Sequence, residues 1–180
     1  VRLDRRGGGR PGAAGLGGPL SEGALRIGVV DPTDQVVRDL DEQVQQEYVA
    51  RYGGPDRTPL EPAQFRGPDG TFLLARLDGA PVAIGGVRRR DEHTAEVKRM
   101  FVVPHARRRG VARRMLATLE QAAAGLGYTR VVLESGPKQP EAVALYAAAG
   151  YVHVPPFGYY AAYPGVHSLG KNIADAPPPG

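Results

Sequence analysis

Residues 102–116 of this 180-residue chain read Val-Val-Pro-His-Ala-Arg-Arg-Arg-Gly-Val-Ala-Arg-Arg-Met-Leu. A β-rich run ends there, a short loop of arginine and glycine follows, and an amphipathic helix is predicted from Gly110 onward. The first turn of a helix has unpaired backbone N–H groups and the positive end of the helix dipole, so an anion can bind there. Gly110 has no side chain to keep a ligand from the backbone, and Ala112 is small. The stretch therefore predicts an anion site that suits a diphosphate.

The loop differs from two well-known phosphate-binding patterns. No Gly-Lys-Ser/Thr follows it, as a Walker A loop requires, and it lacks the three glycines of a dinucleotide-binding fingerprint. The loop alone also allows a second interpretation, in which Arg107, Arg108 and Arg109 are solvated and flank an ordinary helix. The surrounding sequence has to decide between the two interpretations.

Strands and helices alternate on both sides of this loop. The predicted strands are 24–30, 71–77, 81–89, 95–103, 130–133, 151–154 and 166–172. The predicted helices are 35–51, 110–124 and 140–149. The three strands between residues 71 and 103 are separated by short turns, which predicts an antiparallel meander. The order predicts an α/β fold, with helices flanking a mixed central sheet of about six or seven strands.

Composition limits the classes of function. The chain has 42% hydrophobic residues and a formal net charge of +4, which is ordinary for a globular protein and permits attraction to anions. It has no cysteine, which excludes disulfides, thiolate metal ligands and a cysteine nucleophile. The four histidines have no spacing typical of a metal site, so no metal is expected.

Glycine and proline crowd both ends of the chain. Residues 1–23 are predicted to be a disordered Gly/Arg-rich tail and residues 174–180 a disordered Pro-rich tail, which leaves a single domain over 24–173. No apolar run approaches the roughly 18 residues that span a bilayer. The first 23 residues lack the apolar core of a signal peptide. A cytoplasmic protein without a membrane partner is therefore expected, and a homodimer is left open.

Further motifs extend the pattern of the loop. The strand that ends in Met-Phe-Val-Val103 leads into Arg107-Arg-Arg-Gly-Val-Ala112, and Leu145-Tyr-Ala-Ala-Ala-Gly-Tyr151 lies downstream. Together these motifs resemble the GNAT superfamily of N-acetyltransferases, whose hallmark is Arg/Gln-x-x-Gly-x-Gly/Ala between a strand and a helix. The resemblance covers most of residues 25–172. It implies an N-acetyltransferase domain that transfers acetyl from acetyl-CoA directly to a primary amine of a small molecule or peptide.

The resemblance also implies where acetyl-CoA would bind. Backbone amides of the loop would bind its pyrophosphate, and the strand before the loop would pair through its main chain with the pantetheine arm. A backbone N–H aimed at the thioester carbonyl would stabilise an oxyanion. Gln139 stands where the family often carries an asparagine that contacts the cofactor. The implied cofactor-binding set is Met100, Phe101, Val102, Arg107, Arg108, Arg109, Gly110, Val111, Ala112, Arg113, Gln139 and Tyr146.

Tyr146 resembles the family tyrosine that donates a proton to the CoA sulfur. A phenol has a pKa of about 10 and is protonated at neutral pH, which suits a general acid. The alternative is that Tyr146 packs in the core beside Leu145.

Glu96 is the candidate general base. Strand alternation would place Glu96, Lys98, Met100 and Val102 on one face, and some members of the family carry a catalytic glutamate at this spacing. The alternative is a surface glutamate paired with Lys98 or with an arginine across the sheet. Weaker candidates for the base are Glu92 and Glu134.

The acceptor is expected opposite the cofactor, where Tyr48 and Tyr159 would line its site; alternatively, such aromatics only cover the end of the sheet. Two other functions compete with catalysis. A GNAT-like domain could bind acyl-CoA as a sensor without transfer. A basic nucleic-acid-binding module ranks lower, because the arginine cluster over 107–114 contains no aromatic residue.

Overall fold

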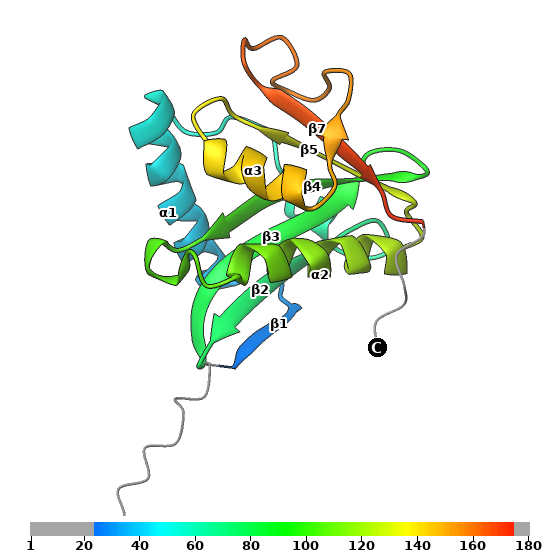
Figure 1. Cartoon of the computed structure of the whole chain (residues 1–180). Coiled ribbons are helices and arrows are strands. Elements are labelled where there is room, and N and C mark those ends of the chain that lie inside the picture. The colour runs from blue at the N-terminus through cyan, green and yellow to red at the C-terminus, as the bar shows by residue number, and fades with distance from the viewer. Residues whose placement is uncertain (1–23, 175–180) are drawn as a thin grey trace, which may run out of the picture.

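A computed structural model describes residues 24–174, so residues 1–23 and 175–180 of the two predicted tails lie outside the described residues. The described strands are β1 Leu25–Val29, β2 Thr71–Leu77, β3 Ala80–Arg89, β4 Thr94–Val102, β5 Arg130–Ser135, β6 Val152–His153 and β7 His167–Asn172. They form one sheet in the order β1-β2-β3-β4-β5-β7-β6 (Figure 1). The predicted mixed α/β fold is confirmed.

β2, β3 and β4 form the predicted antiparallel meander, and β1 pairs antiparallel with β2 at its edge. β4 and β5 run parallel, and β7 pairs antiparallel with both β5 and β6. The β4–β5 pairing begins at Thr94 and Arg130 and ends at Glu96 and Val132. Both strands continue beyond that pair, to Val102 and Ser135, without pairing to each other. The sheet therefore opens between β4 and β5.

Helices and 3-10 turns pack on the two faces of the sheet. They are α1 Gln35–Tyr52, η1 Pro62–Phe65, η2 Pro104–Ala106, α2 Val111–Gly125 and α3 Pro140–Ala148. Side chains of consecutive strand residues point to opposite faces. A β-carbon on Gly85 would meet Leu119 of α2, and one on Gly86 would meet Phe65 of η1. α2 and η1 therefore cover opposite faces, and Figure 1 shows α2 and α3 in front of the sheet.

The two long helices begin and end for identifiable reasons. Asp34 caps α1 by accepting a hydrogen bond from the Val36 amide at 3.0 Å, and Gly53 ends it in the left-handed region with φ of 81°. In α2, Met115 and Leu119 are fully buried against the sheet, as the helical spacing of apolar residues predicts. α2 thus fixes the loop before it to the centre of the sheet.

A β-bulge in β4 overturns the predicted alternation. Lys98 pairs with Gly86, but Phe101 pairs with Ile84, so β4 has one extra residue opposite Gly85. Phe101 is therefore in phase with Glu96 and Lys98. Val102 pairs with Ala83, on the other face. The expectation that Met100 and Val102 share the face of Glu96 is wrong, because a bulge leaves no signal in the hydrophobic pattern.

Candidate active site

The loop between β4 and α2 presents a row of unpaired backbone donors. Arg108 and Gly110 have positive φ, at 59° and 75°, which turns the chain sharply before α2. Within residues 24–174, the amides from Arg108 to Arg113 donate to no backbone acceptor, and the first amide that does is that of Arg114, to Gly110. Six consecutive free amides at a helix start form a site for phosphate oxygens. The loop thus has the unpaired donors that the predicted anion site requires.

Arg107 is arranged differently from the other two arginines of the loop. Arg108 and Arg109 are exposed, and their charges are available to an anion. Arg107 instead turns inward: its Nε donates to the Val102 carbonyl at 2.9 Å and its Nη2 to Glu47 of α1 at 2.5 Å. Arg107 therefore ties the loop to the end of β4 and to α1.

The ion pair between Arg107 and Glu47 belongs to a larger network that bridges the gap between β4 and β5. The guanidinium of Arg51, one turn further along α1, lies 2.7 Å from Glu47 and 2.5 Å from Glu141 at the start of α3. It also donates to the Lys138 carbonyl at 2.6 Å, in the loop after β5. α1 thus links the segment that follows β4 to the segment that follows β5.

A cluster of buried charges lies where β4 and β5 separate. The Glu96 side chain is 5% exposed, accepts from Arg88 at 2.9 Å, and has Oε1 2.9 Å from Lys98 Nζ. Glu96 is therefore paired with Lys98 and with an arginine across the sheet, as the alternative interpretation held, but it is buried rather than on the surface. Its two carboxylate oxygens thus lie against two different cations.

Glu134 of β5 completes this cluster and differs from Glu96. Its side chain is also 5% exposed, but its nearest cation, Lys98, is 3.6 Å away. Neither of its carboxylate oxygens has a hydrogen-bond partner among the described residues. Burial raises the pKa of Glu134, while the Lys98 charge opposes that shift. Sequence reasoning ranked Glu134 below Glu96 because its burial depends on segments distant in the chain.

Tyr146 of α3 is buried, with 7% of its surface exposed, and its ring packs against that of Tyr151 at 5.7 Å between centroids. Burial raises the pKa of Tyr146 to about 12. Burial also raises the pKa of Tyr48 in α1, and Tyr146 lies near enough to add to that shift. α1 and α3 thus bring two phenols toward each other. Gln139 is the N-cap residue of α3, and its side-chain oxygen accepts weakly from the Gly136 amide at 3.4 Å.

The loop between β6 and β7 lies against Glu134 of the charged cluster. Tyr159 is 48% exposed and stacks edge-on against Tyr160 at 4.8 Å between centroids. Tyr160 makes the polar contacts: its hydroxyl donates to Asp56 at 2.8 Å and accepts from the Arg57 amide at 2.8 Å. The predicted Tyr159 therefore stands beside a residue, Tyr160, that joins this loop to the segment after α1.

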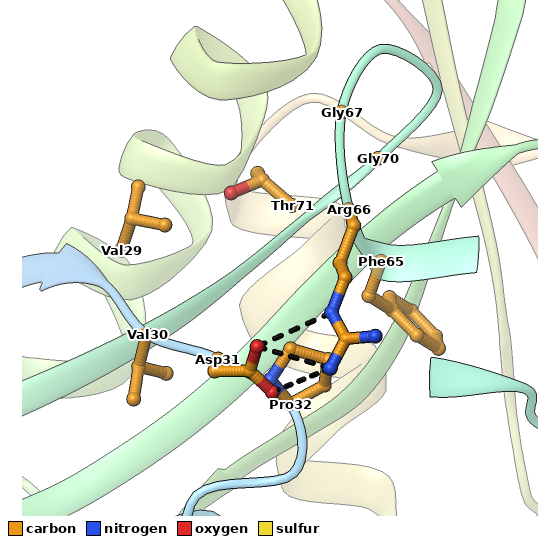
Figure 2. Close-up of a pocket in the computed structure, with 9 residues that line it drawn as sticks. All are labelled: Val29, Val30, Asp31, Pro32, Phe65, Arg66, Gly67, Gly70 and Thr71. Carbon is orange, nitrogen blue, oxygen red and sulfur yellow. Dashed lines mark hydrogen bonds and ion pairs between the residues drawn. The ribbon is translucent and has the colours of Figure 1, made fainter. Parts of the chain in front are cut away.

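A separate cavity of about 290 Å³ lies where β1 ends and β2 begins, at the end of these strands remote from the α2 loop. Figure 2 shows Arg66 and Asp31 joined there by paired hydrogen bonds, at 2.8 to 3.2 Å. The bond from Arg66 holds the pKa of Asp31 well below its usual range. The cavity thus has a satisfied ion pair, and the free amides and buried carboxylates lie elsewhere.

Two properties of residues 24–174 bear on partners. In that part of the chain, no helix has the length and apolar character that a membrane crossing requires. The same residues contain no cluster of three or more histidines, aspartates or glutamates arranged to hold a metal ion.

Comparisons with known proteins agree with this geometry. The Acetyltransferase (GNAT) family matches residues 38–151. A curated relative, an IAA acetyltransferase of Azospirillum brasilense, is 34% identical over 131 residues, which cover 72% of this chain and 83% of the relative.

Solved structures show the same fold. A Klebsiella pneumoniae protein described as an acyl-CoA N-acyltransferase superposes with a TM-score of 0.69 and 26% identity, over 83% of this chain and 97% of its own. A GNAT family acetyltransferase of Elizabethkingia anophelis, solved with acetyl-CoA bound, superposes with a TM-score of 0.58 and 15% identity, over 82% and 97%. The loop with its free amides and the opened sheet lie within the matched range. The chain belongs to the GNAT family of acetyltransferases, whose general chemistry is acetyl transfer.

Proposed function

We propose that this chain transfers the acetyl group of acetyl-CoA to a primary amine of a small molecule or peptide, by direct transfer in a ternary complex. The observation that carries the proposal is the row of free amides from Arg108 to Arg113, directly after a strand that separates from its neighbour. Such a row suits a pyrophosphate, and a strand without a partner on one side can pair with an extended ligand arm.

The residues present fit acetyl-CoA. The amides of 108–113, with the exposed charges of Arg108, Arg109 and Arg113, would hold the pyrophosphate. The main chain of Met100 and Phe101, at the bulge, would hold the pantetheine arm and donate to the acetyl carbonyl oxygen. When bound, acetyl-CoA supplies the acetyl thioester.

Proton transfers would be divided between two side chains. The raised pKa of Tyr146, about 12, keeps its phenol protonated at neutral pH, so it can protonate the departing sulfur. Glu134 is proposed as the base in place of Glu96. Both of its oxygens are without a hydrogen bond among the described residues, and its raised pKa favours proton uptake. Glu96, held by Arg88, would position Lys98 beside Glu134.

The acceptor amine would approach between α1 and the β6–β7 loop, past Tyr48 and the aromatic pair Tyr159 and Tyr160. The hydrogen bonds of Tyr160 already join the β6–β7 loop to the segment after α1, so the two sides of the proposed acceptor path are connected. Aromatic walls can accommodate varied amines.

The test is a panel of primary amines and amino-terminal peptides, each with acetyl-CoA, in which release of free CoA thiol is measured. Acceptor-dependent thiol release at a rate above the acetyl-CoA hydrolysis blank supports the proposal. If no amine increases the rate, while acetyl-CoA still raises the melting temperature, a sensor that binds acyl-CoA without transfer replaces it. Absence of any binding of acetyl-CoA or CoA contradicts both.

A further inference from the structure

Arg99 is the residue at which β4 leaves regular strand geometry. Its φ is 56°, and the extra residue of the bulge lies there. Of the other non-glycine residues with positive φ in 24–174, Asp78 lies in the β2–β3 turn and Arg108 in the loop before α2. A side chain with a β-carbon disfavours this conformation, so contacts elsewhere must hold Arg99 in it.

The Arg99 side chain provides such contacts. It is 9% exposed and lies between two carboxylates from different segments. Its Nε is 3.3 Å from Oδ1 of Asp41 in α1, and its Nη1 is 3.5 Å from Oδ2 of Asp56, in the segment between α1 and η1. Neither nitrogen makes a hydrogen bond among the described residues, so charge attraction to the two carboxylates holds the buried guanidinium in place. The bulge is thus anchored to α1 and to the segment that follows it.

Asp56 extends this anchor to the β6–β7 loop. Its Oδ1 accepts from the amide and the hydroxyl of Thr58, at 2.9 and 2.7 Å, and from the Tyr160 hydroxyl at 2.8 Å. Burial opposes ionisation of Asp56, but these hydrogen bonds and the Arg99 charge leave its pKa lowered. An ionised Asp56 therefore joins Arg99 on one side to Tyr160 on the other.

The anchored bulge lies on the part of β4 that has lost β5 as a partner. Met100 and Phe101 follow Arg99 directly, and their main chain has no support from β5. Small displacements of groups that orient a reacting carbonyl have large effects on rate. Contacts that hold Arg99 in place would thus act on the part of β4 that does not pair with β5, where the orientation of the reacting carbonyl is set.

We propose that Arg99 is a positioning residue for acetyl transfer: it fixes the bulge that aims the Met100 and Phe101 main chain, and Asp56 and Tyr160 couple that bulge to the acceptor-side loop. This inference rests on the proposed function.

The test compares Arg99→Gly with Asp78→Gly. Each variant gives glycine to a left-handed position, but only the first removes a guanidinium at the site. With an amine from the panel, we expect Arg99→Gly to lower kcat about tenfold or more while the Kd for CoA, measured by calorimetry, changes less than about threefold. Asp78→Gly should match the wild-type protein. Arg99→Lys keeps the positive charge but lacks the planar guanidinium. Its kcat should therefore lie between those of Arg99→Gly and the wild-type protein.

Two further measurements keep the proposal testable if Arg99→Gly folds poorly. Tyr160→Phe removes only the hydroxyl that contacts Asp56, and we expect it to raise the KM for the amine more than the KM for acetyl-CoA. Adding Asp56→Asn to Arg99→Gly removes the charge of one of the two carboxylates that Arg99 faces, and kcat should stay low. A kcat for Arg99→Gly equal to that of Asp78→Gly would overturn the inference and leave the proposed function intact. A wild-type protein with no turnover would instead contradict the proposed function.

Discussion

The backbone of Gly158 packs directly against the carboxylate of Glu134. A β-carbon on Gly158 would lie 2.6 Å from Oε2 of Glu134 and 2.9 Å from its Cδ. Gly158 also has a φ of 76°, in the left-handed region. The β6–β7 loop thus helps to bury the carboxylate that we propose as the base.

Gly158→Ala is expected to lower kcat, because the new methyl group must displace either the loop or the carboxylate. The matched control is Gly53→Ala at the end of α1, where φ is 81° and nothing lies within 4 Å of the added carbon. Both variants should lose about 1–2 kcal/mol of unfolding free energy from backbone strain. Only Gly158→Ala should lose turnover. Equal kcat values in steady-state thiol assays of the two variants would show that the contact with Glu134 is unimportant.

The raised pKa of Glu134 predicts a pH-dependent stability. Because burial raises the pKa in the folded protein, this group stabilises the fold fully only below its unfolded value, near 4.5, and that contribution is lost as pH rises through the folded value. Glu134→Gln lacks the titration. We expect its melting temperature, relative to wild type, to be higher at pH 7 than at pH 4. If the melting-temperature difference between the variant and the wild-type protein is the same at both pH values, burial does not destabilise the ionised carboxylate.

Glu134→Gln should also lower kcat without weakening CoA binding, because the amide cannot take up the proton of the amine. Glu96→Gln separates the two candidates for the base. If Glu96 only positions Lys98, its loss should affect kcat less than the loss of Glu134. The reverse order, measured with the same amine, would return the role of base to Glu96.

Tyr146→Phe is expected to lower kcat while leaving the Kd for CoA within about twofold, since the ring that packs on Tyr151 is kept. With its pKa raised to about 12, Tyr146 should stay protonated, so it should cause no alkaline decline of kcat up to pH 10. Rates for both proteins, measured as CoA release with hydrolysis blanks at each pH, test this. Unchanged turnover in the variant would remove Tyr146 from the mechanism.

The sequence pattern predicted the secondary-structure elements more accurately than the tertiary contacts between them. The strand over 71–77 and the helix from Gln35 follow from local alternation and capping, and they appear in the structure with little shift. The bulge at Arg99 does not follow, because tertiary contacts rather than local preference hold its positive φ. The burial of Glu134 depends on Gly158, which lies on a loop distant in sequence.

The role of the Arg107 side chain likewise did not follow from the sequence. Its contacts in the structure lead to a further prediction. Sequence alone treats Arg107 and Arg109 as equivalent charges beside a phosphate site. In the structure, Arg107 bonds to the Val102 carbonyl and Glu47, whereas Arg109 is exposed. Arg107→Ala should therefore displace the loop that carries the free amides.

Arg107→Ala is expected to weaken CoA binding at every salt concentration, because it changes loop position rather than charge near the ligand. Arg109→Ala should weaken binding mainly at low salt, since the contribution of an exposed charge is screened as ionic strength rises. Calorimetric titrations of CoA at about 0.02 and 0.5 M NaCl separate the two effects. If both variants lose affinity only at low salt, the inward contacts of Arg107 do not position the loop, and the arginines act as simple charges.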